Sequence, residues 1–182
     1  LNEVNKLFAG TIFKRDELIE YLHILQDNFG VLYDKHLVAL SALTNLPLTE
    51  IYEVATFYAH FDVVREGKLP PAPVTIRVCD SLSCELQGAQ SLMNNLKSSL
   101  DPSKVRVIRA PCMGRCDTAP VLEIGHNHID NANVGKTKSA LAEKDFLPKI
   151  PAYEGYEAYL ASGGYAKLSE YRKGETTPEE IE

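Results

Sequence analysis

The sequence has no apolar run near the roughly 20 residues that span a bilayer, and no secretory signal is visible. It lacks the glycine-rich phosphate loops of nucleotide-binding proteins, so it is not expected to hold a nucleotide alone. Acidic residues outnumber basic residues, and the formal net charge of −6 argues against a nucleic-acid binder. No nucleophile–base pair or carboxylate dyad stands out. These absences predict a cytoplasmic protein that is not inserted in a membrane, binds no nucleic acid and is not catalytic alone.

The sequence does contain four cysteines, which form two closely spaced pairs. Four residues separate Cys79 from Cys84, three separate Cys112 from Cys116, and 27 lie between the pairs. Two short-spaced thiol pairs are typical of one metal centre held from two loops. Zinc sites usually have the narrower C-x₂-C spacing, whereas C-x₄-C occurs among 2Fe–2S proteins. The spacing therefore favours a 2Fe–2S cluster with Cys79, Cys84, Cys112 and Cys116 as ligands.

Other uses of the cysteines remain open. Two disulfides would imply an oxidising compartment, and zinc or a redox-active dithiol are further alternatives, although no C-x-x-C is present. A Rieske-type centre would need two histidine ligands, but four cysteines already suffice, so His126 and His128 are expected to be surface or turn residues. The rival from a different functional class is a zinc- or disulfide-stabilised interaction domain.

The first third of the chain has helical periodicity. Apolar residues recur at three- and four-residue steps from Asp16 to Phe29, and Gly30 is a natural stop. Two further apolar stripes, around Leu40 and Ile51, predict two more helices. We therefore expect a small helical bundle over residues 1–66, followed by a proline-rich linker over residues 67–73.

After the linker the periodicity changes to that of an α/β domain. Strand, helix, strand, two hairpin strands and a closing helix are predicted over residues 74–80, 85–98, 105–110, 121–125, 128–130 and 136–146, in that order. This layout over residues 74–146 resembles thioredoxin and places both cysteine pairs where strands give way to loops. Residues 147–182 are too poor in periodic apolar positions to build a core, so we expect an extended tail. The predicted fold class is α+β.

Several residues beside the cysteines suggest how the site is supported. Gly114 lies inside the second pair, where a positive φ is expected. Ser81 and Ser83 either cap backbone groups in the first loop or simply face water. Three arginines either offset the negative charge of a cluster or form ordinary salt bridges: Arg77, Arg109 and Arg115.

Three stretches carry a family resemblance. In order, IYEVATFYAHF (Ile51–Phe61), VCDSLSC (Val78–Cys84) and APCMGRCDTAP (Ala110–Pro120) resemble the 24-kDa-type subunit of respiratory complex I. The resemblance covers residues from about 12 to 146. It implies a helical N-terminal bundle followed by a thioredoxin-like 2Fe–2S ferredoxin domain, with the same four cysteines as ligands.

The C-terminal stretch adds a second resemblance. YEGYEAYLASGGYAKL (Tyr153–Leu168) looks like the lead-in to the FMN- and NADH-binding 51-kDa-type subunit. The stretches FYAHFDVV, RVCDSLSC and GHNHID are most similar to the N-terminal part of the fused beta (diaphorase) subunit of molybdenum- or tungsten-dependent, NAD-dependent formate dehydrogenase. We therefore expect the chain to be the N-terminal piece of a longer fused polypeptide, or a separately encoded piece of it.

This resemblance implies an electron-transfer module. Its cluster would exchange electrons with the FMN of a 51-kDa-type module, fused or separate. FMN, NAD and further Fe–S clusters are expected in that partner, and a larger molybdenum- or tungsten-containing catalytic subunit is the second partner. The alternatives are the 24-kDa-type subunit of complex I or of an NAD-reducing hydrogenase. The sequence does not select among these donors, and it indicates neither reduction potential nor oligomeric state.

Overall fold

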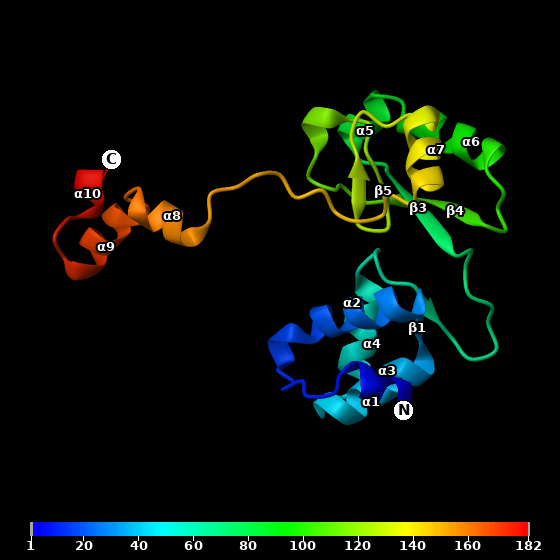
Figure 1. Cartoon of the computed structure of the whole chain (residues 1–182), viewed down its shortest axis with the longest axis horizontal. Coiled ribbons are helices and arrows are strands. Elements are labelled where there is room, and N and C mark those ends of the chain that lie inside the picture. The colour runs from blue at the N-terminus through cyan, green and yellow to red at the C-terminus, as the bar shows by residue number, and fades with distance from the viewer. Residues whose placement is uncertain (1, 182) are drawn as a thin grey trace. The chain divides into compact units, whose positions relative to one another are not determined.

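The computed structural model describes residues 2–181. By its contacts the chain divides into two compact units, one ending at Pro148 and one beginning at Lys149 (Figure 1). Across residues 2–181, no helix is both long and apolar enough to cross a membrane.

The first unit begins with a helical lobe, residues 2–66. Its elements are α1 (Asn2–Leu7), η1 (Arg15–Glu17), α2 (Leu18–Phe29), β1 (Leu32–Tyr33), α3 (Asp34–Thr44), α4 (Leu48–Phe57) and β2 (Val63–Val64). α2 ends where Gly30 adopts φ 75° and donates its N–H to the Gln26 carbonyl at 2.7 Å, so the predicted stop is confirmed. The short parallel pair β1–β2 was not predicted, because two-residue strands have no visible periodicity.

The sheet lobe, residues 74–148, contains a four-stranded sheet. Its elements are β3 (Val74–Cys79), α5 (Leu82–Leu86), α6 (Ala89–Ser99), β4 (Val105–Ala110), η2 (Cys116–Thr118), β5 (Leu122–Ile124), β6 (Asn127–Ile129) and α7 (Val134–Glu143). The strand order is β4-β3-β5-β6, with β3 parallel to β4 and β5 antiparallel to both β3 and β6. α6 packs against β3, β4 and α7 (Figure 1). The predicted strand–helix–strand order followed by a hairpin and a helix is confirmed.

One predicted helix is wrong in its extent. The sequence predicts a single helix over residues 85–98, but the structure has two, α5 and α6, separated at Gly88 with φ 88°. A left-handed residue cannot continue an α-helix, and glycine adopts that conformation without steric cost. The first of the two helices, α5, begins directly after Ser81 and carries Cys84, which interacts with Cys79 at the end of β3.

The two lobes have separate hydrophobic cores. Fully buried side chains of the helical lobe include Leu22, Leu25, Leu37, Leu40 and Ile51. Those of the sheet lobe include Ile76, Leu96, Leu122 and Ile124. Each such side chain contributes about 1.5–3 kcal/mol when it leaves water. The predicted boundaries, with the first two lobes as independent domains, stay a prediction.

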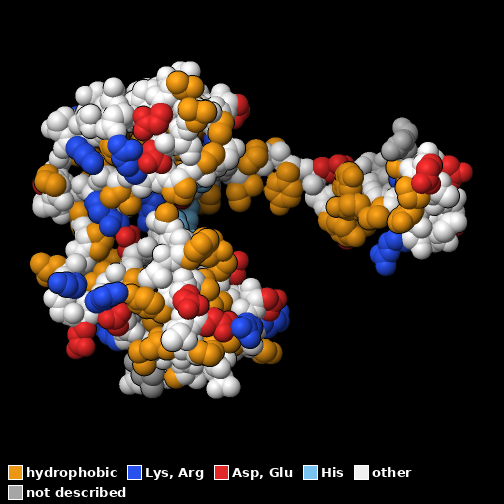
Figure 2. Space-filling view, turned by 180° about the vertical axis from the view of Figure 1, so that it is seen from behind, with side chains coloured by type: hydrophobic (Ala, Val, Ile, Leu, Met, Phe, Trp, Pro, Cys, Tyr) orange, Lys and Arg blue, Asp and Glu red, His pale blue; other side chains and the backbone are white. Residues whose placement is uncertain are grey.

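The second unit lacks a core among its described residues. It contains α8 (Tyr156–Ala161), α9 (Ala166–Lys173) and α10 (Pro178–Ile181), and none of these helices has a buried residue. The expected extended tail is thus partly helical. Hydrophobic side chains, orange in Figure 2, gather on its surface, including Tyr153 and Tyr156, which are 79% and 65% exposed.

Candidate metal centre

Both cysteine pairs leave the same edge of the sheet. Cys79 is the last residue of β3, and Cys112 follows the end of β4 at Ala110. The two strands are parallel neighbours in which Cys79 lies opposite Ala110, and the Asp80 N–H donates to the Ala110 carbonyl at 3.0 Å. The prediction that the pairs lie where strands give way to loops is confirmed.

The first pair is buried. Cys79 and Cys84 are each 2% exposed, Cys79 at the strand end and Cys84 within α5. Val121 contacts both through its backbone: its carbonyl accepts the Cys79 N–H at 3.0 Å, and its N–H interacts with the Cys84 thiol. Burial raises the pKa of Cys84, and the Val121 N–H opposes that rise. The segment after the second pair therefore anchors the first.

The second pair is exposed and closely spaced. The Sγ atoms of Cys112 and Cys116 lie 3.5 Å apart. Gly114 adopts φ 74°, as expected, and its N–H donates to Cys112 Sγ at 3.4 Å. This bond lowers the pKa of Cys112, whereas contact with Cys112 raises the pKa of Cys116. A backbone donor aimed at sulfur favours the thiolate form that metal ligation requires.

The two pairs meet. Cys79 interacts with Cys84 and with both members of the second pair, and Cys84 also interacts with Cys116. All four are free thiols. Within the described residues 2–181, no three or more His, Cys, Asp or Glu side chains converge as a ready-made site for one metal ion. A 2Fe–2S cluster instead takes two thiolates at each iron, and two thiol pairs at one sheet edge fit that donor set.

The serines of the first loop have a different role from the one expected. Ser81 is the N-cap residue of α5, but its side chain makes no capping hydrogen bond, so the capping alternative is wrong for Ser81. Instead the Ser81 side chain interacts with Cys112 and the Ser83 side chain with Cys116, and each lowers the pKa of that thiol. Local sequence patterns do not indicate these contacts, because they join residues more than thirty positions apart.

The three arginines form salt bridges. Arg77 pairs with Asp62, Arg109 with Asp80 and Arg115 with Asp130. The last pair supports the second cysteine loop directly. Arg115 Nε donates to Asp130 Oδ1 at 2.7 Å, and Thr118 Oγ1 donates to the same oxygen at 2.7 Å. The Arg115 guanidinium lowers the pKa of Asp130 to about 2. Because Arg115 and Thr118 lie on either side of Cys116, their bonds to Asp130 clamp both ends of the loop around Cys116.

Replacing Asp130 by asparagine is expected to loosen this loop. The pair is partly exposed, with 45% of Arg115 and 32% of Asp130 accessible, so its loss should cost only about 1 kcal/mol. We expect roughly fivefold faster bleaching of the visible absorbance when a chelator removes the metal. Asp117→Asn, in the same loop, is the matched control and should bleach like the wild type. Equal rates for Asp130→Asn and the wild type would contradict the clamp.

The clamp also predicts a direction of pH dependence. The folded-state pKa of Asp130 lies below its ordinary value of 3.8, so its stabilisation is present above about pH 4 and is lost as the pH falls toward 2. Asp130→Asn should therefore flatten the acid limb of a stability–pH curve in that window.

The chain resembles known proteins over most of its length. The family model described as thioredoxin-like [2Fe-2S] ferredoxin matches residues 4–145. The NADP-reducing hydrogenase subunit HndA of Solidesulfovibrio fructosivorans is 28% identical over 149 residues, which are 78% of this chain and 84% of that one. An NADH-quinone oxidoreductase subunit of Aquifex aeolicus is 32% identical over 119 residues, 61% of this chain and 71% of that one.

A solved structure shares the fold. The NAD⁺-reducing [NiFe]-hydrogenase in the H2-reduced state superposes with a TM-score of 0.54 at 23% identity, over 74% of this chain and 23% of that one. The chain thus spans about a quarter of that hydrogenase chain. The family match includes the whole sheet and both cysteine pairs. The chain therefore belongs to the thioredoxin-like [2Fe–2S] ferredoxin family, and its cofactor is a 2Fe–2S cluster.

Proposed function

We propose that this chain is an electron-transfer module whose cluster is held by Cys79, Cys84, Cys112 and Cys116. The observation that carries the proposal is that both thiol pairs leave one edge of the sheet, from neighbouring parallel strands. When bound, a 2Fe–2S cluster supplies one-electron transfer. The chain's own part is to present deprotonated sulfur.

The exposed pair marks the side on which electrons would enter or leave. Cys79 and Cys84 are buried, whereas Cys112 and Cys116 are exposed. Leu82 and Leu86, on the same helix as Cys84, are both 76% exposed and leave an apolar face beside the site. A redox partner that covers this face would come close to the Cys112–Cys116 pair while excluding water from it.

The partner that fits best is an FMN- and NADH-binding module of the 51-kDa type, fused or separate. Flavin converts two-electron hydride chemistry into one-electron chemistry, which an iron–sulfur centre can accept. Support comes from relatives whose names are NADP-reducing hydrogenase and NADH-quinone oxidoreductase subunits. The exposed tyrosines of the unit that begins at Lys149 offer it a docking surface. In this proposal the chain is not catalytic alone.

A finer assignment is to a cytoplasmic, NAD-dependent formate dehydrogenase with a molybdenum- or tungsten-containing catalytic subunit. Its support is the similarity of the stretches FYAHFDVV, RVCDSLSC and GHNHID to the beta subunit of that enzyme. The 24-kDa-type subunit of complex I or of an NAD-reducing hydrogenase is the alternative, and the names of the relatives favour it.

The test is anaerobic bleaching of the visible absorbance. We expect the isolated chain to be bleached by dithionite and left unchanged by NADH, and we expect NADH to bleach it once a flavin module is added. Rapid stoichiometric bleaching by NADH without flavin would contradict the assignment as a relay. To identify the electron donor, formate, hydrogen and quinol are supplied in turn to the complex purified with its partners. Metal analysis for molybdenum, tungsten and nickel accompanies each assay.

A further inference from the structure

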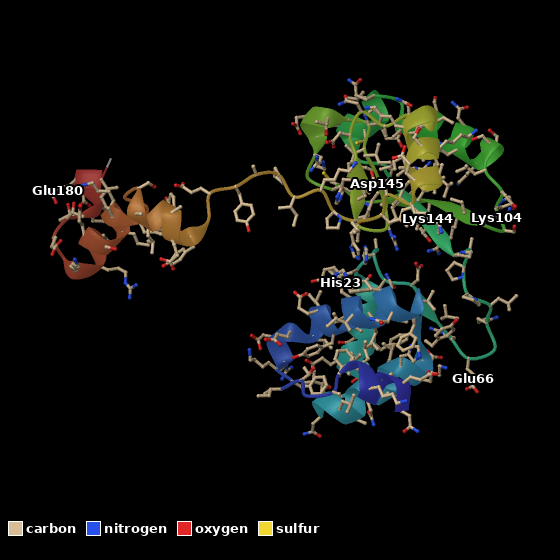
Figure 3. The ribbon with its side chains drawn as sticks, in the orientation of Figure 1. His23, Glu66, Lys104, Lys144, Asp145 and Glu180 are labelled. Atoms are coloured by element: carbon tan, nitrogen blue, oxygen red, sulfur yellow. The ribbon has the colours of Figure 1, made fainter. Side chains whose placement is uncertain are left out.

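Three histidines far apart in the sequence come together where the helical lobe contacts the sheet lobe. His23 lies on α2 (Figure 3), His60 in the segment between α4 and β2, and His126 in the turn between β5 and β6. The ring centroids of His23 and His60 are 4.8 Å apart, those of His60 and His126 are 5.4 Å apart, and those of His23 and His126 are 6.1 Å apart. We call these three residues the histidine cluster.

Two members of the histidine cluster have a carboxylate beside them. His126 Nε2 lies 2.9 Å from Asp27 Oδ1, and His60 Nδ1 lies 3.9 Å from Glu123 Oε2. Both of these contacts join the helical lobe to the sheet lobe. Each contact therefore places a carboxylate of one lobe beside a histidine ring of the other.

The surroundings of His23 are less favourable to a proton. Its ring packs edge-on against Phe61 at 4.9 Å and lies against the rings of both other histidines. Burial lowers its pKa most, and His60 and His126 lower it further, while Asp27 and Glu20 oppose the shift. When all three rings are charged, His23 lies 4.8 Å and 6.1 Å from two other imidazolium rings, and the carboxylates that contact the cluster pair with His60 and His126.

We propose that the histidine cluster is a pH-sensitive contact, which holds the helical lobe against the sheet lobe while His23 is neutral and loosens when His23 takes up a proton. The charged and titratable groups around it come from every neighbouring element: Glu20 and Asp27 of α2, Asp62 before β2, Arg77 of β3, Glu123 of β5 and His128 of β6. The Arg77–Asp62 ion pair also joins the two lobes, so loosening of the histidine cluster shifts the population of loosened molecules and does not separate the lobes completely.

The direction in which pH changes the stability of the closed form follows from the protons that each form binds. A histidine whose folded-state pKa lies below its ordinary value of 6.5 binds fewer protons in the closed form than in the loosened form. The closed form is therefore fully favoured above that value and loses stability as the pH falls from 6.5 to the folded-state pKa. The linker that joins the lobes is exposed from Gly67 to Pro70, which leaves them free to move apart.

The test is small-angle scattering of the whole, cluster-loaded chain at about pH 8 and about pH 5, the range over which histidine changes charge. We expect the radius of gyration to rise on acidification in the wild type and to stay constant in His23→Gln. His36→Gln, which alters a buried histidine of α3 outside the cluster, should expand like the wild type. Visible absorbance checks that the metal centre is intact in every sample.

A permanently charged side chain at position 23 provides a second test. His23→Arg carries a permanent charge and should be expanded already at about pH 8, with no further change at about pH 5. A wild type that does not expand, a His23→Gln variant that expands equally, or a compact His23→Arg variant would each overturn the proposal. None of these results bears on the cysteine ligands, so this proposal and the proposed function fail separately.

Discussion

Asp62→Ala is expected to lower the free energy of unfolding by about 3 kcal/mol, because it leaves a buried guanidinium without its counter-ion. Asp62 lies 3.3 Å from Arg77 and also pairs with Arg106. The Arg77 side chain is only 7% exposed, and burial lowers its pKa, so it depends on Asp62 to remain charged at low cost. The measurement is urea unfolding followed by circular dichroism.

Two further variants separate lost charge from lost packing. Asp62→Asn keeps the shape and one acceptor oxygen, so it should cost less than alanine. Adding Arg77→Met to Asp62→Ala removes the stranded charge and should recover part of the loss. A loss below about 0.5 kcal/mol for Asp62→Ala would show that the Arg77 charge is balanced elsewhere.

Cys84→Ala is expected to abolish cluster binding. Cys84 is 2% exposed and lies in α5 against Cys79, so no other thiol can take its place from outside. Loss of an outer-sphere partner typically costs 10- to 100-fold in metal affinity, and loss of a ligand should exceed roughly that range. The measurement is iron bound per purified chain, read together with the visible absorbance.

The matched control is Leu82→Ala, which changes an exposed residue two positions before Cys84 in the same helix. It should retain the cluster. Full iron content in Cys84→Ala would remove this residue from the proposed ligand set, whereas loss in both variants would point to a disrupted helix.

The sheet lobe was predictable because its strands carry their own signals. Alternating apolar residues gave the strand 105–110, which the structure reproduces as β4, Val105–Ala110. Thiol spacing likewise pointed to one centre, and the parallel pairing of β3 and β4 brings both pairs to a single edge. The apolar alternation and the thiol spacing both lie within short stretches of sequence, so they can be read without knowledge of the tertiary fold.

Other features depend on contacts that local patterns do not encode. The break at Gly88 was missed because Leu86, Leu92 and Leu96 continue a helical stripe across it. The partners of Ser81 and Arg115 come from another loop, and they are known only once the strands are in register. His126 was expected as a surface or turn residue; it does lie in the β5–β6 turn, but it also contacts Asp27, 99 residues away.

Iron and acid-labile sulfide analysis of the anaerobically purified chain, combined with electron paramagnetic resonance after dithionite reduction, decides whether the four cysteines hold a 2Fe–2S cluster. We expect about two irons and two sulfides per chain, with one unpaired spin appearing on one-electron reduction. Stoichiometric zinc without labile sulfide, or a colourless protein with two disulfides, would contradict it.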